Sequence, residues 1–147
     1  PPQARSSAAS DVYKRQAHNF GGIRAIVNSV SNIYHDLIIV YGWGGERDSS
    51  ERGKIMKFTC ANSRKVIFTS DNCRNESFQS ILDDSRKDQE YSNLIVEPDR
   101  KQAIKNGIDA LKEDEILLIL GKGHEEFQEI KGTKIPFNDQ RVVEEIL

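Results

Sequence analysis

The chain has 147 residues, of which 30% are charged and 37% hydrophobic, and its formal net charge is −2. This length suits one domain with a substantial core, and the charge argues against a general nucleic-acid binder, which needs a basic face. No apolar run is long enough to span a membrane. From the charge and the apolar runs together, we expect neither a nucleic acid nor a membrane as partner. Two cysteines without a CxxC pair indicate a reducing, cytoplasmic setting.

Residues 1–16 differ in composition from the rest of the chain. They are small, polar and aperiodic, with little to bury. They resemble translated vector or linker sequence, and a targeting presequence is the competing interpretation, because Asp11 is their single acidic residue. On either interpretation we expect residues 1–16 to be a disordered, non-native leader and the domain to cover residues 17–147.

Strand and helix patterns alternate from residue 17 onward. Short apolar runs predict four strands, at residues 37–41, 66–69, 94–96 and 116–120. Helical spacing of apolar residues predicts helices over residues 22–33, after a cap at Ser49 or Ser50, after Ser77 and after Asp99. The alternation predicts an α/β fold with a Rossmann-like, mostly parallel sheet and helices on both faces.

The pattern changes near the C-terminus. Residues 127–130 and 133–136 flank Lys131-Gly132, which predicts a β-hairpin at the edge of the sheet. Asp139 is then the predicted cap of a last helix.

Polar loops follow three of the predicted strands: GWGGERD at residues 42–48, SDNCR at 70–74 and GKGHE at 121–125. Because parallel strands end at the same edge of a sheet, where α/β folds bind ligands, we expect these loops to converge if their strands are neighbours. The sequence therefore predicts a binding site at this edge.

The loops carry both signs of charge. Arg47 and Arg74 suit a carboxylate or phosphate, whereas Asp71 and Glu125 suit an ammonium group. A site with both signs favours a zwitterion such as an amino acid over a bare phosphate.

Each loop also has a purely structural interpretation. The glycines are typical of a tight turn, Asp71 and Asn72 of helix capping, Trp43 of packing, and Cys73 of a passive small side chain. The glycine loop lacks the GxGxxG fingerprint, and GKGH lacks the Walker A spacing, so we find no phosphate-binding loop in the chain.

Together these motifs resemble the C-terminal domain of the Mur ligases, and within that family the MurE type that adds meso-diaminopimelate. The matching features are the Ala17-His18 pair, GxGGxRD at residues 42–48, a DNPR-like motif at 71–74, GKGHE at 121–125 and a late Asp-Arg pair in residues 139–141. The resemblance covers about Ala17 to Leu147, with the motifs in the same order.

This resemblance implies a cytoplasmic, ATP-dependent amide ligase of peptidoglycan synthesis. ATP and Mg²⁺ would act in a central domain that this sequence does not include, phosphorylating the D-glutamate carboxylate of UDP-MurNAc-L-Ala-D-Glu. The present domain would bring meso-diaminopimelate, whose amine attacks the acyl phosphate, and would meet the UDP-MurNAc dipeptide through the other domains. We therefore expect the fragment alone to be inactive and to hold no cofactor.

The resemblance also implies which residues hold the amino acid. They are Arg47, Asp71, Asn72, Cys73, Arg74, Gly121 and Glu125. Arg74 would pair with a carboxylate and Glu125 with an ammonium. We assign no catalytic residue and no metal ligand, because catalysis here is positioning of the nucleophile. No cofactor-binding residue is assigned either, although His18 is kept as a candidate.

The sequence departs from the family pattern at three places. Cys73 replaces a proline, which removes a fixed φ from the recognition loop. Glu51-Arg52 stands where Lys-Arg is usual, and Gln16 stands where an aromatic residue is usual. Two alternatives remain: the equivalent domain of another Mur or folylpolyglutamate-type ligase, and a non-catalytic Rossmann-like module that binds an amino acid or nucleotide.

Overall fold

The computed structural model describes residues 3–4, 11–15, 19–46, 49–121 and 127–147. Strands and helices alternate through most of this length. The strands are β1 (Gln3–Ala4), β2 (Asp11–Arg15), β3 (Asp36–Tyr41), β4 (Lys65–Phe68), β5 (Leu94–Val96), β6 (Glu115–Leu120), β7 (Phe127–Ile130) and β8 (Thr133–Pro136). The helices are α1 (Phe20–Ser31), α2 (Arg52–Ala61), α3 (Phe78–Arg86), α4 (Arg100–Ala110) and α5 (Asp139–Ile146).

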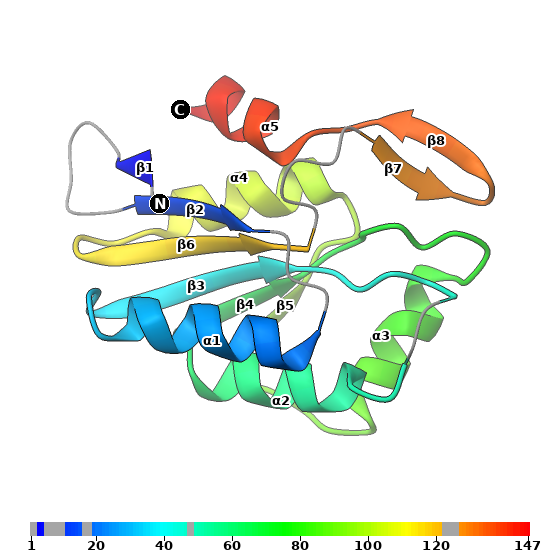
Figure 1. The fold of residues 1–147 in the computed structure, drawn as a ribbon, viewed down its shortest axis with the longest axis horizontal. Coiled ribbons are helices and arrows are strands. Elements are labelled where there is room, and N and C mark those ends of the chain that lie inside the picture. Colours follow the sequence, from blue (N-terminus) through cyan, green and yellow to red (C-terminus); the bar gives the residue numbers. More distant parts are fainter. Residues whose placement is uncertain (1–2, 5–10, 16–18, 47–48, 122–126) are drawn as a thin grey trace.

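The main sheet has six strands in the order β1-β2-β6-β3-β4-β5. All neighbours pair in parallel except β1, which runs antiparallel to β2. Helices α4 and α5 cover one face of the sheet, and α1 and α2 cover the other (Figure 1). The predicted α/β fold, with a mostly parallel sheet between helices, is confirmed.

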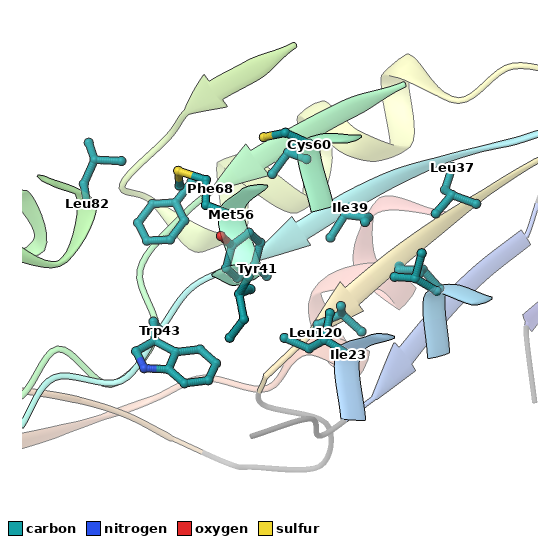
Figure 2. Packing of buried hydrophobic residues seen from close by; sticks show 14 of the residues in the cluster. Ile23, Leu37, Ile39, Tyr41, Trp43, Met56, Cys60, Phe68, Leu82 and Leu120 are labelled. Carbon is teal, nitrogen blue, oxygen red and sulfur yellow. The ribbon is translucent and has the colours of Figure 1, made fainter. Parts of the chain in front are cut away.

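The central strands are apolar throughout because both of their faces are covered. In β3, Ile39 and Tyr41 pack toward α1 and α2, whereas Ile38 and Val40 pack toward α4. Every residue of β6 is buried. Figure 2 shows the first of these layers, with Tyr41 beside Phe68 in an edge-on ring contact at 5.2 Å. Parallel strands buried on both faces have this unbroken apolar pattern rather than an alternating one.

Most helices begin at a side-chain cap. Ser77 and Asp99 cap α3 and α4, as predicted. Two caps differ from the prediction. The residue before α2 is Glu51, which makes no side-chain cap, so neither Ser49 nor Ser50 takes that position. The cap of α5 is Asn138, whose side chain accepts from the backbone N–H of Arg141. The Asp139 carboxylate accepts from the Arg100 guanidinium instead.

The structure differs from the sequence expectation at the N-terminus. Residues 11–15, which the sequence analysis leaves outside the fold, form β2 along the full length of the last five residues of β6. Val12 is fully buried in the same apolar cluster as Ile104 and Val142. A strand whose other residues are mostly polar or charged gives no apolar run, so periodicity did not reveal it.

The C-terminal hairpin forms as predicted, but it does not extend the main sheet. Strands β7 and β8 make a separate two-stranded sheet. It contacts the chain after β4 through a parallel bridge between Arg74 and Ile130. The hairpin therefore lies over the segment that the sequence analysis assigns to ligand binding.

We predict that Val12→Ala lowers the free energy of unfolding by about 1–3 kcal/mol, because it removes buried methyl groups and leaves a cavity beside β6. The measurement is chemical denaturation of both variants. Ile33→Ala is the control, since Ile33 is 69% exposed and should change stability little. Equal stability of the Val12 variant and the wild type would mean that β2 does not pack on the domain in solution.

Candidate functional site

Three strand ends meet at one edge of the sheet. In the pairing register, Tyr41 at the end of β3 stands beside both Phe68 of β4 and Leu120 of β6. The chain after each strand therefore starts at the same level. The backbone N–H of Thr69 donates to the carbonyl of Tyr41 at 2.9 Å, so the first two loops separate only beyond this point. The described starts of the three loops therefore lie together, as the parallel arrangement predicts.

Glycines allow the loops to touch backbone to backbone. A Cβ on Gly42 would overlap the carbonyl oxygen of Thr69, and one on Gly45 would overlap that of Cys73. Gly121 has φ +113, and a Cβ there would lie 2.7 Å from Oδ2 of Asp71. Glycine at these positions is thus required by contacts inside the protein, before any ligand is considered.

Asp71 and Asn72 are buried at the centre of this edge. Oδ1 of Asp71 accepts from the backbone N–H of Asn72 at 2.8 Å, and the carboxylate faces Gly121. The carbonyl of Asn72 accepts from the N–H of Gly45 at 2.8 Å. The strand-end segments that carry Asp71, Gly45 and Gly121 therefore form one connected unit.

The hairpin is docked on this unit through side chains. Oδ1 of Asn72 accepts from the backbone N–H of Glu129 at 2.8 Å. Nε2 of Gln128, a buried residue, donates to Oγ of Ser70 at 2.6 Å and to the carbonyl of Asp71 at 3.0 Å. Two neighbouring residues of β7 thus fix the position of residues 70–72.

Arg74 lies where the two loops and the hairpin meet. Its backbone takes the left-handed conformation with φ +55, and its N–H donates to the carbonyl of Glu129 at 3.0 Å. Its Nη1 donates to the carbonyls of Gly45 at 2.9 Å and Asn72 at 3.2 Å. Its Nε is 3.6 Å from Oε1 of Glu129, and the Arg74 side chain is 18% exposed.

Cys73 and Trp43 are buried in the apolar cluster that faces α1 and α2. Burial supports the structural interpretation of both side chains, as packing residues beneath the loops. The backbone N–H of Cys73 donates to the carbonyl of Asp71 at 3.1 Å, a bond that a proline at this position could not make. The chain therefore has a local constraint on this loop in place of the fixed φ of proline.

Three of the predicted residues, Arg47, Glu125 and the candidate His18, lie outside the described residues. The structure brings together the other five: Asp71, Asn72, Cys73, Arg74 and Gly121. Within the described ranges, no group of three potential ligands is placed to hold a metal ion. No helix in the same ranges is long and apolar enough to cross a membrane.

Sequence reasoning missed a buried ion pair beneath the site. The Arg100 guanidinium, whose side chain is 0% exposed, binds both carboxylate oxygens of Asp139 at 2.8 Å. Its other donors reach the carbonyls of Ser70 at 3.1 Å and Leu120 at 3.2 Å. The partners are far apart in sequence, and Asp139 at a helix start reads as a cap, so no local pattern indicates the pair.

A second missed cluster holds the glycine loop from the other side. Arg52, buried at the start of α2, binds both oxygens of Glu76 at 2.9 and 3.0 Å and donates to the carbonyl of Gly44 at 3.1 Å. Its second carboxylate partner is Asp84 of α3 at 3.2 Å. Hydrogen bonds from Arg52 hold the pKa of the Glu76 carboxyl at about 2, below its ordinary value.

Comparison with known proteins shows the family of the chain. A family model described as "Mur ligase, glutamate ligase domain" matches residues 5–123 of the chain. The chain belongs to this family. The match includes residues of β2, which the sequence analysis had left outside the domain.

Two curated relatives with high identity are both named UDP-N-acetylmuramoyl-L-alanyl-D-glutamate--2,6-diaminopimelate ligase. The protein of Aquifex aeolicus (strain VF5) is 47% identical over 116 residues, which are 76% of this chain and 23% of that protein. The protein of Helicobacter pylori (strain J99 / ATCC 700824) is 40% identical over 130 residues, or 88% and 29% of the two lengths. The chain thus spans about a quarter of the length of these relatives.

A solved structure of a ligase with the same name has a similar fold. It matches with a TM-score of 0.90 at 28% identity, and the match covers 99% of this chain and 30% of the other. The Mur ligase fold of this chain is therefore the fold of one part of a larger diaminopimelate ligase.

We predict that Asp139→Asn lowers the free energy of unfolding by roughly 3–5 kcal/mol, because it removes a carboxylate that binds the fully buried Arg100 guanidinium through two hydrogen bonds. Chemical denaturation measures the loss. The matched control is Asp109→Asn, which removes an exposed ion pair with Lys105 and should cost less than about 1 kcal/mol. Similar losses of unfolding free energy in the two variants would show that the buried pair stabilises the fold no more than an exposed one.

The depressed pKa of Glu76 predicts a pH-dependent contribution to stability. A carboxyl whose pKa falls from 4.5 to about 2 on folding stabilises the native state above its unfolded pKa, and this contribution is lost as the pH falls toward 2. The difference in unfolding free energy between wild type and Glu76→Gln should be full at pH 6 and shrink between pH 5 and 2. A difference that stays constant over this range would contradict the prediction, and Glu90→Gln, at an exposed residue, serves as control.

Proposed function

We propose that this chain is the amino-acid-binding, C-terminal domain of an ATP-dependent ligase. The ligase joins meso-diaminopimelate to UDP-MurNAc-L-Ala-D-Glu in peptidoglycan synthesis, in the cytoplasm. Support comes from the shared name of the curated relatives, at 35–47% identity, and from the matching solved structure. Because the chain spans about a quarter of those relatives, the activity belongs to the larger enzyme, and the chain alone is inactive.

The observation that carries the proposal is the position of Arg74. The Arg74 guanidinium lies at the edge of the sheet where the parallel strands end, and it donates to the carbonyl of Gly45 in the glycine loop. Asp71 and Asn72, in the same loop as Arg74, are buried. An arginine takes a carboxylate by two parallel hydrogen bonds, and Asp71 offers the opposite charge for an ammonium group. Diaminopimelate has an amine and a carboxylate at each end, so this combination suits it.

The chemical contribution of such a domain is to hold the nucleophile. Fixing the far end of diaminopimelate at Arg74 orients the near amine toward an activated carboxyl group, and orientation of this kind supplies much of the rate in bimolecular reactions. ATP and Mg²⁺ supply the activation and would be held by other parts of the enzyme. In this proposal Arg47, Gly121 and Glu125 complete the amino-acid site, and no residue of the chain acts as acid or base.

We predict that Arg74→Ala weakens meso-diaminopimelate binding by roughly 2–4 kcal/mol and lysine binding much less, because lysine lacks the second carboxylate. Arg74→Lys should not restore binding, since an ammonium does not reproduce the planar fork. The measurement is titration of the ¹⁵N-labelled chain with each amino acid, followed by NMR, together with the thermal melting point of each variant.

Arg24→Ala is the matched control, because Arg24 lies exposed on α1. Arg74 does not select the substrate if the wild-type chain binds lysine more tightly than diaminopimelate. The same follows if Arg74→Ala loses equal affinity for the two amino acids.

A further inference from the structure

The donors of Arg74 are divided between two edges of its guanidinium group. Nη1 donates to the carbonyls of Gly45 and Asn72, so that end is committed to the backbone of the loops. Nε and Nη2 together form the other edge, which can donate two parallel hydrogen bonds to one carboxylate. Within the described part of the chain, Nη2 makes no hydrogen bond.

Glu129 stands at this open edge. Its Oε1 lies 3.6 Å from Nε of Arg74, which is beyond hydrogen-bond length but close enough for an ionic contact. The two side chains are 18% and 29% exposed, so solvent and a small ligand can reach them. The Glu129 carboxylate therefore makes only a long ionic contact at the edge where a ligand carboxylate would accept two hydrogen bonds.

The backbone of Glu129 keeps its side chain in this place. Its N–H donates to Oδ1 of Asn72 at 2.8 Å, and its carbonyl accepts from the N–H of Arg74 at 3.0 Å. The side chain carries none of these bonds. A change of the carboxylate to an amide thus removes charge and leaves the docking of the hairpin intact.

We propose that Glu129 is an internal counterion of Arg74 which the second carboxylate of the amino acid displaces on binding. This inference rests on the proposed function. The pairing keeps the arginine oriented when the site is empty, and it lowers the affinity for a diamino dicarboxylic acid, which must break it. A diamino monocarboxylic acid such as lysine binds without breaking it. Glu129 therefore sets how strongly the site prefers the extra carboxylate.

The test compares wild type, Glu129→Gln and a control in which Glu113, exposed in the turn before β6, becomes glutamine. Each ¹⁵N-labelled 147-residue chain is titrated with meso-diaminopimelate and with L-lysine by NMR. We expect Glu129→Gln to lower the Kd for diaminopimelate roughly three- to five-fold, the range of a partly exposed ion pair, and to leave the Kd for lysine unchanged. The control variant should match wild type for both.

The outcomes separate this inference from the function on which it rests. If wild type binds diaminopimelate and Glu129→Gln binds it equally or more weakly, the displacement is wrong while the function stands. Weaker binding of both amino acids by Glu129→Gln would mean that Glu129 contacts the far ammonium group instead, which also overturns the inference. No binding of diaminopimelate by wild type would overturn the proposed function together with this inference.

Discussion

The buried pair of Arg100 and Asp139 is the constraint on which the binding edge depends. A buried guanidinium is tolerated only when its charge and donors are satisfied, and this one is satisfied by two carboxylate oxygens and two backbone carbonyls. The carbonyls belong to Ser70 and Leu120, the residues just before Asp71 and Gly121. One side chain therefore fixes the exits of β4 and β6 relative to each other and anchors α5 to both.

Arginine has the same structural use in two further places around this edge. Arg52 joins the carbonyl of Gly44 to Glu76, and Arg74 joins the carbonyls of Gly45 and Asn72 to Glu129. Each guanidinium binds strand-end backbone on one side and faces a carboxylate on the other. They differ in burial, and the half-buried Arg74 is the one whose carboxylate contact is loose enough for a ligand to replace.

The features that sequence predicted are those encoded locally. Uninterrupted apolar runs at 37–41 and 116–120 predicted the buried strands, and Ser77 and Asp99 predicted helix starts, because each signal lies within a few residues. The pairing of Arg100 with Asp139 depends on contacts 39 residues apart, which no local pattern encodes. Strand β2 was missed because its place in the sheet comes from backbone pairing with β6, and it contributes only Val12 to the described core.

Surface loops usually tolerate inserted residues and diverge quickly, because few contacts fix their backbone. The loop after β3 lacks that freedom over its first part: Gly42 and Gly45 leave no space for a side chain against the backbone of residues 69–73. An insertion or a larger residue in either segment would require a matching change in the other. These two segments should therefore change together over evolutionary time, at the pace of a protein interior.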